Sequence, residues 1–382
     1  MTKLFIVGAK RTPQGRLLGA FVKRSAADLA KEAGNEILKT IAPGDLDQVI
    51  MGNVISAGQG MNIARQIGLG LGLPLDRHAC TVNMMCGSGM QSVILACQAI
   101  LAGDANAILC GGTESMSRAP YLLDRARGGY KLGDGVLMDS ILRDGLTDPS
   151  SGKHMGLTME ALGSQCKIDR QLQDIFALQS QQKYAAAQTR GAFTDEIVPV
   201  DNVAHDEHPR PDVTLEKLSA MKPVFKPDGT ITPGNASGIN DGAALLVVCN
   251  ETMLARKGWI PLARIAGWST VGCDPEQVGL GPVYATHKLC QKLAITTDVF
   301  DAIEINEAFA VQTLACIKEL NLKTDRVNPN GGGISLGHPI GASGARLLVH
   351  LAHRIARQEI GKALATLCVG GGMGTAVMLE RA

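Results

Sequence analysis

Apolar and polar residues along this chain form short blocks that switch between two patterns. Runs of neighbouring apolar residues at 4–7, 48–54 and 107–110 are typical of strands buried on both faces of a sheet. Between them, residues 26–40 and 90–101 carry apolar side chains at intervals of three and four, which predicts helices. Strands that alternate with helices indicate an α/β protein with layers around a buried sheet.

This pattern repeats weakly within the chain. Gly89 and its helix, followed by the strand at 107–110, parallel Gly344 and its helix, followed by a strand around Cys368. Two similar α/β halves would bring Cys86 and Cys368 close together where the halves meet. The repeat permits this arrangement without requiring it.

The stretch from about 116 to 238 differs from both halves. Glycines, prolines and scattered arginines surround one helical segment at 169–190, and a proline-rich segment follows at 208–211. This composition predicts an inserted domain that is rich in loops. Its basic residues could bind the phosphates of a nucleotide-like ligand, although an ordinary solvated surface explains any one of them as well.

Residues 83–89 place one thiol, that of Cys86, just before the predicted helix at 90–101. Unpaired amides and the positive end of the helix dipole favour an anion there, so we expect a lowered pKa for this thiol and a reactive thiolate. The neighbouring glycines allow a tight turn and a close approach of substrate. On this stretch alone, a structural cysteine in a glycine-rich turn is an equally good interpretation.

The last third of the chain carries two more glycine-rich segments with chemically useful side chains. Residues 328–346 run into a helix and contain His338, and residues 367–374 follow a strand and contain Cys368. A lone histidine in such a loop is usually structural, and a small apolar residue would serve equally well in place of Cys368.

Four blocks of the chain resemble signature blocks of the thiolase family. They are residues 83–89, 306–309, 337–339 and 368–374, in the family's order, and the likeness runs nearly end to end from residues 11–13 to the last strand. The resemblance implies the thiolase fold, in which two similar α/β halves form a layered αβαβα core with an inserted loop domain.

By this resemblance the chain divides into three parts. Residues 1–115, together with about 239–260, would form the N-terminal half, and residues 261–382 the C-terminal half. Residues 116–238 would form the loop domain, which in thiolases binds coenzyme A and helps to form a tetramer.

The resemblance also assigns catalytic roles. Cys86 would be the nucleophile, His338 would keep it a thiolate and donate to an oxyanion, and Cys368 would be the second acid and base. Asn306, which could equally be a turn or cap residue, would hold a water in that oxyanion hole. The backbone amides of Cys86 and Gly370 would form a second oxyanion hole.

The implied reaction is the reversible condensation of two acetyl-CoA to acetoacetyl-CoA and CoA through an acetylated Cys86, a step of lipid metabolism. It needs neither a metal nor a cofactor beyond the coenzyme A thioesters, which are the substrates. The substrate-binding positions that the resemblance implies are Ser237, Gly238, Arg210, His154, Met155 and Phe309.

Three other functions stay open. A degradative 3-ketoacyl-CoA thiolase of broader chain length would share every catalytic residue, although residues 234–238 and Met155 look more like the short-chain type. A decarboxylating condensing enzyme of the same fold usually has a second histidine where this chain has Cys368. A degenerate thiolase-fold binding protein would have lost at least one catalytic residue, and this chain keeps them all.

Composition narrows the remaining possibilities. A net charge of +1 and 3% aromatic residues give no sign of a nucleic-acid partner. Ten cysteines without a CxxC pair are typical of a reduced, cytoplasmic protein. We find no apolar run long enough to span a membrane, so we expect no membrane association. A homotetramer is expected from the family resemblance alone.

Overall fold

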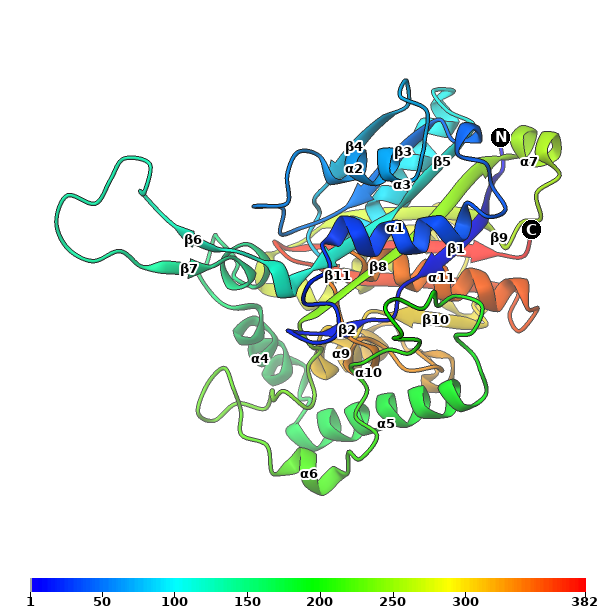
Figure 1. Ribbon diagram of the computed structural model, residues 1–382. Helices are drawn as coiled ribbons and strands as arrows, with labels where there is room; N and C mark the ends of the chain where they lie inside the picture. Colours follow the sequence, from blue (N-terminus) through cyan, green and yellow to red (C-terminus); the bar gives the residue numbers. More distant parts are fainter. Residues whose placement is uncertain (1) are drawn as a thin grey trace.

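The structure, a computed structural model that describes residues 2–382, is built on one ten-stranded sheet of mixed direction (Figure 1). The strand order is β10-β11-β12-β9-β1-β8-β5-β3-β4, and the short strand β2 pairs with β8. The strands are β1 (Leu4–Arg11), β2 (Gly15–Arg16), β3 (Gln48–Gly52), β4 (His78–Val82), β5 (Ala107–Ser115), β8 (Asn240–Asn250), β9 (Ala263–Gly272), β10 (Ala302–Ile305), β11 (Lys362–Val369) and β12 (Met373–Glu380).

The large sheet consists of two similar parts that meet along a short seam. Strands β1 and β9 pair over only three residues, Leu4 to Ile6 of β1. On one side of this seam β3 runs parallel to β4 and β5, and on the other β10 runs parallel to β11. Each half therefore keeps its own small set of parallel strands, as the weak sequence repeat suggests.

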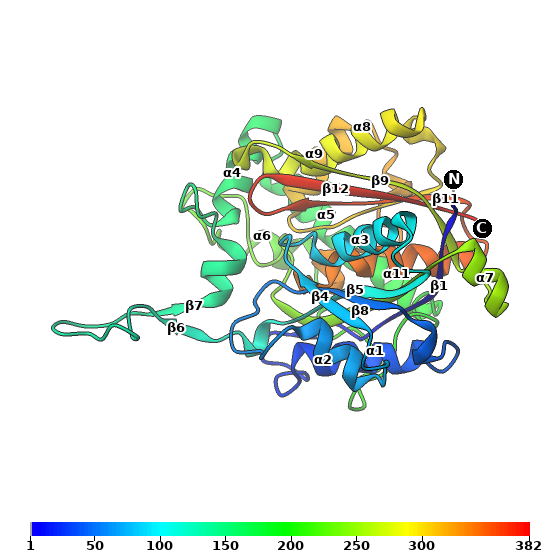
Figure 2. The ribbon, with the colours of Figure 1, turned by 90° about the horizontal axis from the view of Figure 1, so that it is seen from above.

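Helices complete five layers, which are seen edge-on in Figure 2. Helices α3 and α11 lie between the two parts of the sheet, α1 and α2 cover one outer face, and α8 and α9 cover the other. The αβαβα arrangement expected from the sequence is confirmed. The helices of this core are α1 (Ala26–Ile37), α2 (Ile63–Gly70), α3 (Ser88–Ala102), α7 (Glu251–Lys257), α8 (Gly281–Leu293), α9 (Ala310–Glu319), α10 (Gly333–Leu336) and α11 (Ser343–Ala356).

Three apolar clusters fill the spaces between these layers. The largest contains the buried faces of α3 and α11 together with inward-facing residues of both sheet parts. The second lies between the N-terminal strands and α1, and the third between the C-terminal strands and α8 and α9. Every residue of β5 and β8 is buried, which explains why their sequences are continuously apolar where they cross the core.

The two central helices touch each other at equivalent glycines. A Cβ atom on Gly89 would lie 2.8 Å from the carbonyl oxygen of Gly341, and one on Gly344 would lie 2.7 Å from the amide nitrogen of Met90. These distances leave no room for any side chain. The paired glycines of the sequence repeat therefore form a second contact between the two halves, in addition to the seam between β1 and β9.

The inserted segment forms a separate region beside the core (Figure 1). Its hairpin, β6 (Tyr121–Leu123) with β7 (Leu137–Asp139), projects as an arm, and the rest packs below the sheet edge. The chain re-enters the sheet at β8, between β1 and β5, so we retain the division at 115, 238 and about 260 as a proposal. Its helices are the π-helical turn Ile141–Leu146, α4 (Met155–Cys166), α5 (Arg170–Thr189) and α6 (Leu215–Ser219).

The expectation that no apolar run is long enough to span a membrane is wrong. The stretch Met85–Ala102 is apolar and long enough, by length and composition, to cross a bilayer, and 56% of it is buried inside the protein. It coincides with α3, the helix between the two sheet parts. A helix that is covered on all sides is apolar all round for the same reason as a membrane span.

We predict that Gly344→Ala destabilises the protein although alanine favours helix formation. The new methyl group would collide with the backbone of Met90, and overpacking of this kind costs about 1–3 kcal/mol. The measurement is the midpoint of urea unfolding. Gly44→Ala is the matched control, because no atom lies within 4 Å of its added methyl group; equal midpoints for the two variants would contradict the assigned contact.

Candidate active site

Four strands deliver side chains to one region of the molecule, from their carboxyl ends or from the loops that follow them. Val54 follows β3, Cys86 follows β4 and Asn306 follows β10, while Cys368 is the last residue but one of β11. Parallel strands direct their carboxyl ends to the same edge of a sheet, which is where α/β proteins commonly bind ligands. The two half-sheets thus supply one site in common.

Cys86 lies in a tight turn between β4 and α3. Met85 has a positive φ of 46°, and the amide of Gly87 donates to the carbonyl oxygen of Met84 at 2.9 Å. The hydroxyl of Ser88 donates to the carbonyl oxygen of Met85 and accepts from the amide of Met84. This closed network fixes the thiol in the turn before the helix, two residues ahead of its first residue Ser88, as the sequence predicts.

The surroundings of Cys86 change its expected acidity. Burial raises the pKa of its thiol to about 11, and the charge of Glu114 contributes to the rise. The backbone amides of Gly370 and of Cys86 itself point at the sulfur and oppose the rise. The expectation of a lowered thiol pKa at a helix N-terminus is therefore wrong, because the loss of water outweighs the nearby amides. A neighbouring base has to remove the proton.

His338 has the properties of such a base. Burial and the charge of Arg346 lower the pKa of its imidazole to about 4, so the ring is neutral at neutral pH. Its amide donates to Oδ1 of Asn240 at 3.0 Å, and its Nδ1 contacts the hydroxyl of Ser343. Gly337, at φ 108°, has Asn240 against its backbone, so only glycine fits there.

Asn306 lies beside this histidine, and Cys368 lies near Cys86 in the same site. The side-chain nitrogen of Asn306 is 3.4 Å from Nε2 of His338, and its Oδ1 is buried without a partner among residues 2–382. This leaves a polar corner in which a water molecule would be held. Cys368 is 7% exposed, and burial together with the neighbouring Cys86 raises its pKa well above the usual range.

A buried carboxylate, that of Glu114, joins the two halves behind the site. It accepts hydrogen bonds from the amides of Val54 and Ile55 in one half and from the amide of Gly341 in the other, at 3.0 to 3.2 Å. Burial raises its pKa to about 7. Because Gly341 is three residues from His338, this carboxylate fixes the histidine loop against the N-terminal half.

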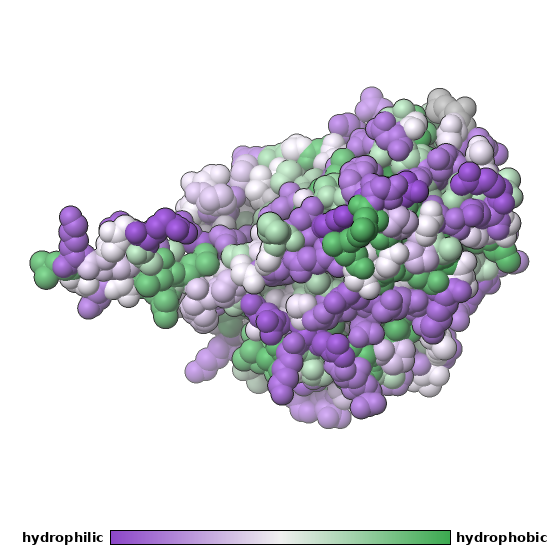
Figure 3. All heavy atoms as spheres, turned by 45° about the horizontal axis from the view of Figure 1, so that its top comes forward, coloured by the Kyte–Doolittle hydropathy of each residue, from purple (hydrophilic) through white to green (hydrophobic). Residues whose placement is uncertain are grey.

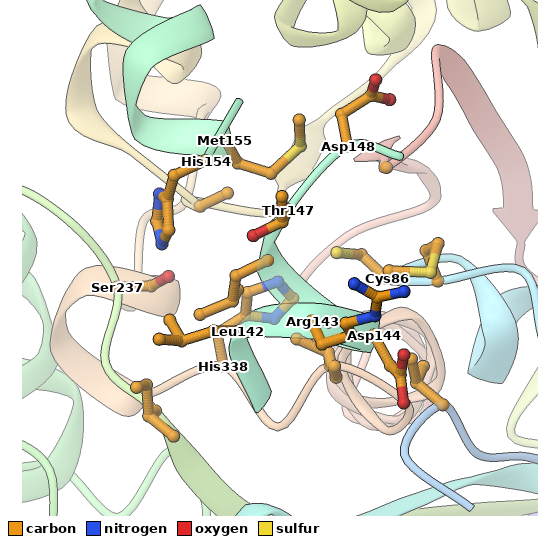
Figure 4. Close-up of a pocket in the computed structure, with 18 of the residues that line it drawn as sticks. Cys86, Leu142, Arg143, Asp144, Thr147, Asp148, His154, Met155, Ser237 and His338 are labelled. Atoms are coloured by element: carbon orange, nitrogen blue, oxygen red, sulfur yellow. The ribbon is translucent and has the colours of Figure 1, made fainter. Parts of the chain in front are cut away.

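These residues open into one cavity of about 1240 Å³ (Figure 4). His154 and Met155, at the start of α4, lie across the opening from Cys86 and His338. The predicted site residues that line this cavity are Cys86, His338, Cys368, Gly370, Ser237, Gly238, His154, Met155 and Phe309.

The loop-domain wall of the cavity is built from stacked rings and a short strand contact. The rings of His154 and Phe225 stack with centroids 4.6 Å apart, and Phe225 meets Phe309 edge-on. The amide of Ser237 donates to the carbonyl oxygen of Ala308 at 3.0 Å. Segments far apart in sequence thus form one continuous surface.

Two predicted site residues lie outside this lining. Asn306 contacts Nε2 of His338, as described above. Arg210 is two residues from His208, whose ring packs against the backbone of Gly238, and the main-chain amide of Arg210 donates to the side chain of Gln181. Its contact with substrate stays a prediction.

Models of two families match almost the whole chain. One, described as the thiolase N-terminal domain, matches residues 4–252, and the other, the thiolase C-terminal domain, matches residues 259–381. The chain belongs to the thiolase family. It is therefore an acyltransferase, as its sequence blocks suggest.

Curated relatives of this thiolase include two kinds of enzyme. An acetyl-CoA acetyltransferase of Escherichia coli is 49% identical over 100% of both chains. One from Chromobacterium violaceum is 47% identical over 98% of this chain and 99% of its own. The human mitochondrial 3-ketoacyl-CoA thiolase is 42% identical over 99% of this chain and 98% of its own.

Solved thiolase structures superimpose closely on this one. Human mitochondrial 3-ketoacyl-CoA thiolase in complex with CoA has a TM-score of 0.97 at 43% identity and covers 100% of this chain and 98% of its own. The Bacillus anthracis acetyl-CoA acetyltransferase has a TM-score of 0.97 at 40% identity, covering 100% and 99%.

Three residues of this thiolase site are absent from the sequence-based prediction. Glu114, Asn240 and Ser343 hold the loops that carry the reactive groups, through hydrogen bonds to residues up to 227 positions away in sequence. The only available signal for Glu114 is a charged residue at the end of a continuously apolar strand. No local pattern singles out the other two.

We predict that alkylation of Cys86 by iodoacetamide keeps accelerating above pH 9. Since its pKa is near 11, the thiolate population rises about tenfold for each pH unit in this range. Peptide mass spectrometry distinguishes Cys86 from Cys80 and Cys273, which are partly exposed as Cys86 is. A rate that levels off below pH 9 would contradict the effect assigned to burial.

Proposed function

We propose that this thiolase is an acetyl-CoA C-acetyltransferase. It would condense two acetyl-CoA reversibly to acetoacetyl-CoA and CoA, through an acetyl group on Cys86. The observation that carries the proposal is the meeting of Cys86, His338 and Cys368 in one cavity, with two backbone amides aimed at the Cys86 sulfur. The acetyl-CoA acetyltransferases at 47% and 49% identity support the choice of substrate.

In the first half-reaction Nε2 of His338 accepts the proton of the Cys86 thiol. The sulfur attacks the thioester carbonyl of acetyl-CoA, and the amides of Cys86 and Gly370 donate to the oxyanion that forms. The bond between the acetyl carbon and the sulfur of CoA breaks. The departing CoA thiolate takes the proton of Cys368, which leaves an acetylated Cys86, a cationic His338 and a Cys368 thiolate.

In the second half-reaction the Cys368 thiolate takes an α-proton from a second acetyl-CoA. The resulting enolate oxygen is stabilised by the cationic His338 and by a water held on Asn306. The enolate carbon attacks the acetyl group, and the bond from that group to Cys86 breaks. The Cys86 thiolate recovers its proton from His338, so every group returns to its starting state.

A degradative 3-ketoacyl-CoA thiolase is the second candidate. The mitochondrial 3-ketoacyl-CoA thiolase at 42% identity favours it, and it would use the same residues. The two functions differ in the length of the acyl chain accepted beside Cys86, and not in chemistry.

We also propose that the protein assembles as a homotetramer through its projecting arm, the β6–β7 hairpin. The arm carries apolar side chains on its surface (Figure 3). Among them, Leu132 is 99% exposed and Val136 is 74% exposed. Exposed apolar groups of this kind usually mark a protein contact. We place the enzyme in lipid metabolism in the cytoplasm, where its ten free cysteines would stay reduced.

We predict that Cys86→Ala abolishes formation of the acetyl-enzyme, because the nucleophile is lost. Intact-mass spectrometry of the wild type after incubation with acetyl-CoA should show one acetyl adduct per chain. Cys249→Ala, which removes a buried thiol far from the cavity in the N-terminal core, is the control and should keep the adduct. An adduct of wild-type occupancy on Cys86→Ala would refute the proposed intermediate.

We predict that Cys368→Ala slows condensation more than acetylation. In the proposed scheme Cys368 is the base that removes the α-proton, and no other group replaces it. Loss of a general base typically slows a reaction by about 10²- to 10⁴-fold. Rapid-quench measurement of acetyl-enzyme formation and of acetoacetyl-CoA formation separates the two steps. Equal losses in both would argue against a proton-transfer role for Cys368.

A further inference from the structure

The imidazole of His338 is held at both ring nitrogens. Its Nδ1 faces the hydroxyl of Ser343, and its Nε2 faces the side-chain nitrogen of Asn306 at 3.4 Å. The ring is 5% exposed, so no bulk water competes for these contacts. Which nitrogen carries the proton in the neutral ring is therefore decided by these two neighbours.

Ser343 favours a proton on Nδ1. Its hydroxyl also lies 2.9 Å from the carbonyl oxygen of Pro339, which can only accept a hydrogen bond. A hydroxyl has a single proton, and when that proton is donated to Pro339 the serine oxygen is left to accept one from the imidazole. The Nδ1–H tautomer satisfies both contacts at once.

Asn306 favours the same tautomer independently. Its amide nitrogen is a donor, so it requires a lone pair on Nε2 of His338. With the proton on Nε2 instead, two donors would face each other in a buried position. Both neighbours thus favour an Nε2 that carries no proton and whose lone pair can accept one.

The fold places Ser343 where it can act on this ring. It is the first residue of α11, 1% exposed, and lies five residues after His338 across the turn that begins at Pro339. The amide of Ser343 also donates to Pro339, at 3.0 Å, which fixes the backbone of the turn. Neither the helix start nor the turn requires a hydroxyl at this position.

We propose that Ser343 is a positioning residue of this thiolase, whose hydroxyl accepts from Nδ1–H of His338 and so holds the imidazole in the tautomer with a free Nε2. The inference rests on the proposed function, in which Nε2 takes the proton of Cys86.

A serine has an advantage over a carboxylate in this role. When Nε2 gains the proton of Cys86, the positive ring strengthens its bond to the serine oxygen. Because that oxygen carries no charge, it does not raise the basicity of the ring as a carboxylate would. His338 can then return the proton to Cys86 at the end of the cycle.

The test compares Ser343→Ala with Ser343→Thr, which keeps a hydroxyl, and with Ser269→Ala. Ser269 is a matched control, because its buried hydroxyl also donates to a carbonyl oxygen but lies away from the cavity. Ser343→Ala should lower kcat for acetoacetyl-CoA thiolysis by about 10- to 100-fold, with KM changed less than about twofold. This loss is smaller than the roughly 10²- to 10⁴-fold typical of removing a general base itself, because His338 is still present. Ser343→Thr should recover most of the loss.

Alkylation of Cys86 by iodoacetamide gives a readout that needs no substrate. In Ser343→Ala the rate should fall at pH 7, where His338 assists removal of the proton, and stay unchanged at pH 10, where hydroxide removes it. In a His338→Ala background the serine substitution should have no further effect, since it acts only through the ring. If Ser343→Ala does not fold, Ser343→Cys replaces it, because a thiol is a much weaker acceptor of similar size.

Different outcomes contradict the role of Ser343 and the proposed acetyltransferase function. A wild-type kcat in Ser343→Ala, equal losses at both pH values, or a further loss in the His338→Ala background would overturn the role of Ser343. Failure of the wild-type protein to form an acetyl adduct on Cys86 would overturn the proposed function instead.

Discussion

The contact between α3 and α11 is the constraint on which the site depends. At Gly89 and Gly344 the two helices approach until backbone meets backbone, and any side chain there would push the half-sheets apart. Cys86 precedes the first helix and His338 precedes the second. The same contact between the two helices therefore packs the core and brings the reactive groups together.

Burial of these groups then determines the chemistry. With water removed, both thiols resist ionisation and the imidazole resists protonation, so the resting site is uncharged at His338, Cys86 and Cys368 at neutral pH. Charge would arise only as protons pass between groups already in place. The histidine loop is held by hydrogen bonds to Asn240 and Ser343, and by the bond of Gly341 to Glu114, so little reorganisation is needed during reaction.

Much of this architecture could be predicted from the sequence, because it depends on the spacing of apolar residues within short segments. The spacing of apolar residues places α3 at 90–101, against the observed Ser88–Ala102, and the strand at 107–110 extends to Ser115. The difference at the strand end has a physical cause: Thr113 and Glu114 are polar, but their side chains are satisfied by distant backbone groups inside the core. Periodicity cannot reveal such partners.

The pKa of the Cys86 thiol could not be predicted from the sequence for a related reason. A helix N-terminus can be predicted from a glycine-rich turn before an apolar helix, and its effect on a thiol is favourable. How much water the folded chain removes from that thiol depends on β11 and the histidine loop, which are more than 250 residues away. Burial in the folded protein therefore raises the pKa of this thiol, although the helix N-terminus alone would lower it. The role of Ser343 likewise depends on a ring orientation that only the folded turn defines.

The most direct test of the proposed function is thiolysis of 3-ketoacyl-CoA substrates of increasing chain length, compared as kcat/KM. This ratio reports how well each acyl chain fits beside Cys86 in the transition state. We expect the highest value for acetoacetyl-CoA, with a fall of at least about tenfold for chains of eight carbons and longer. Equal or higher values for the longer chains would contradict it and identify a degradative thiolase that uses the same catalytic residues.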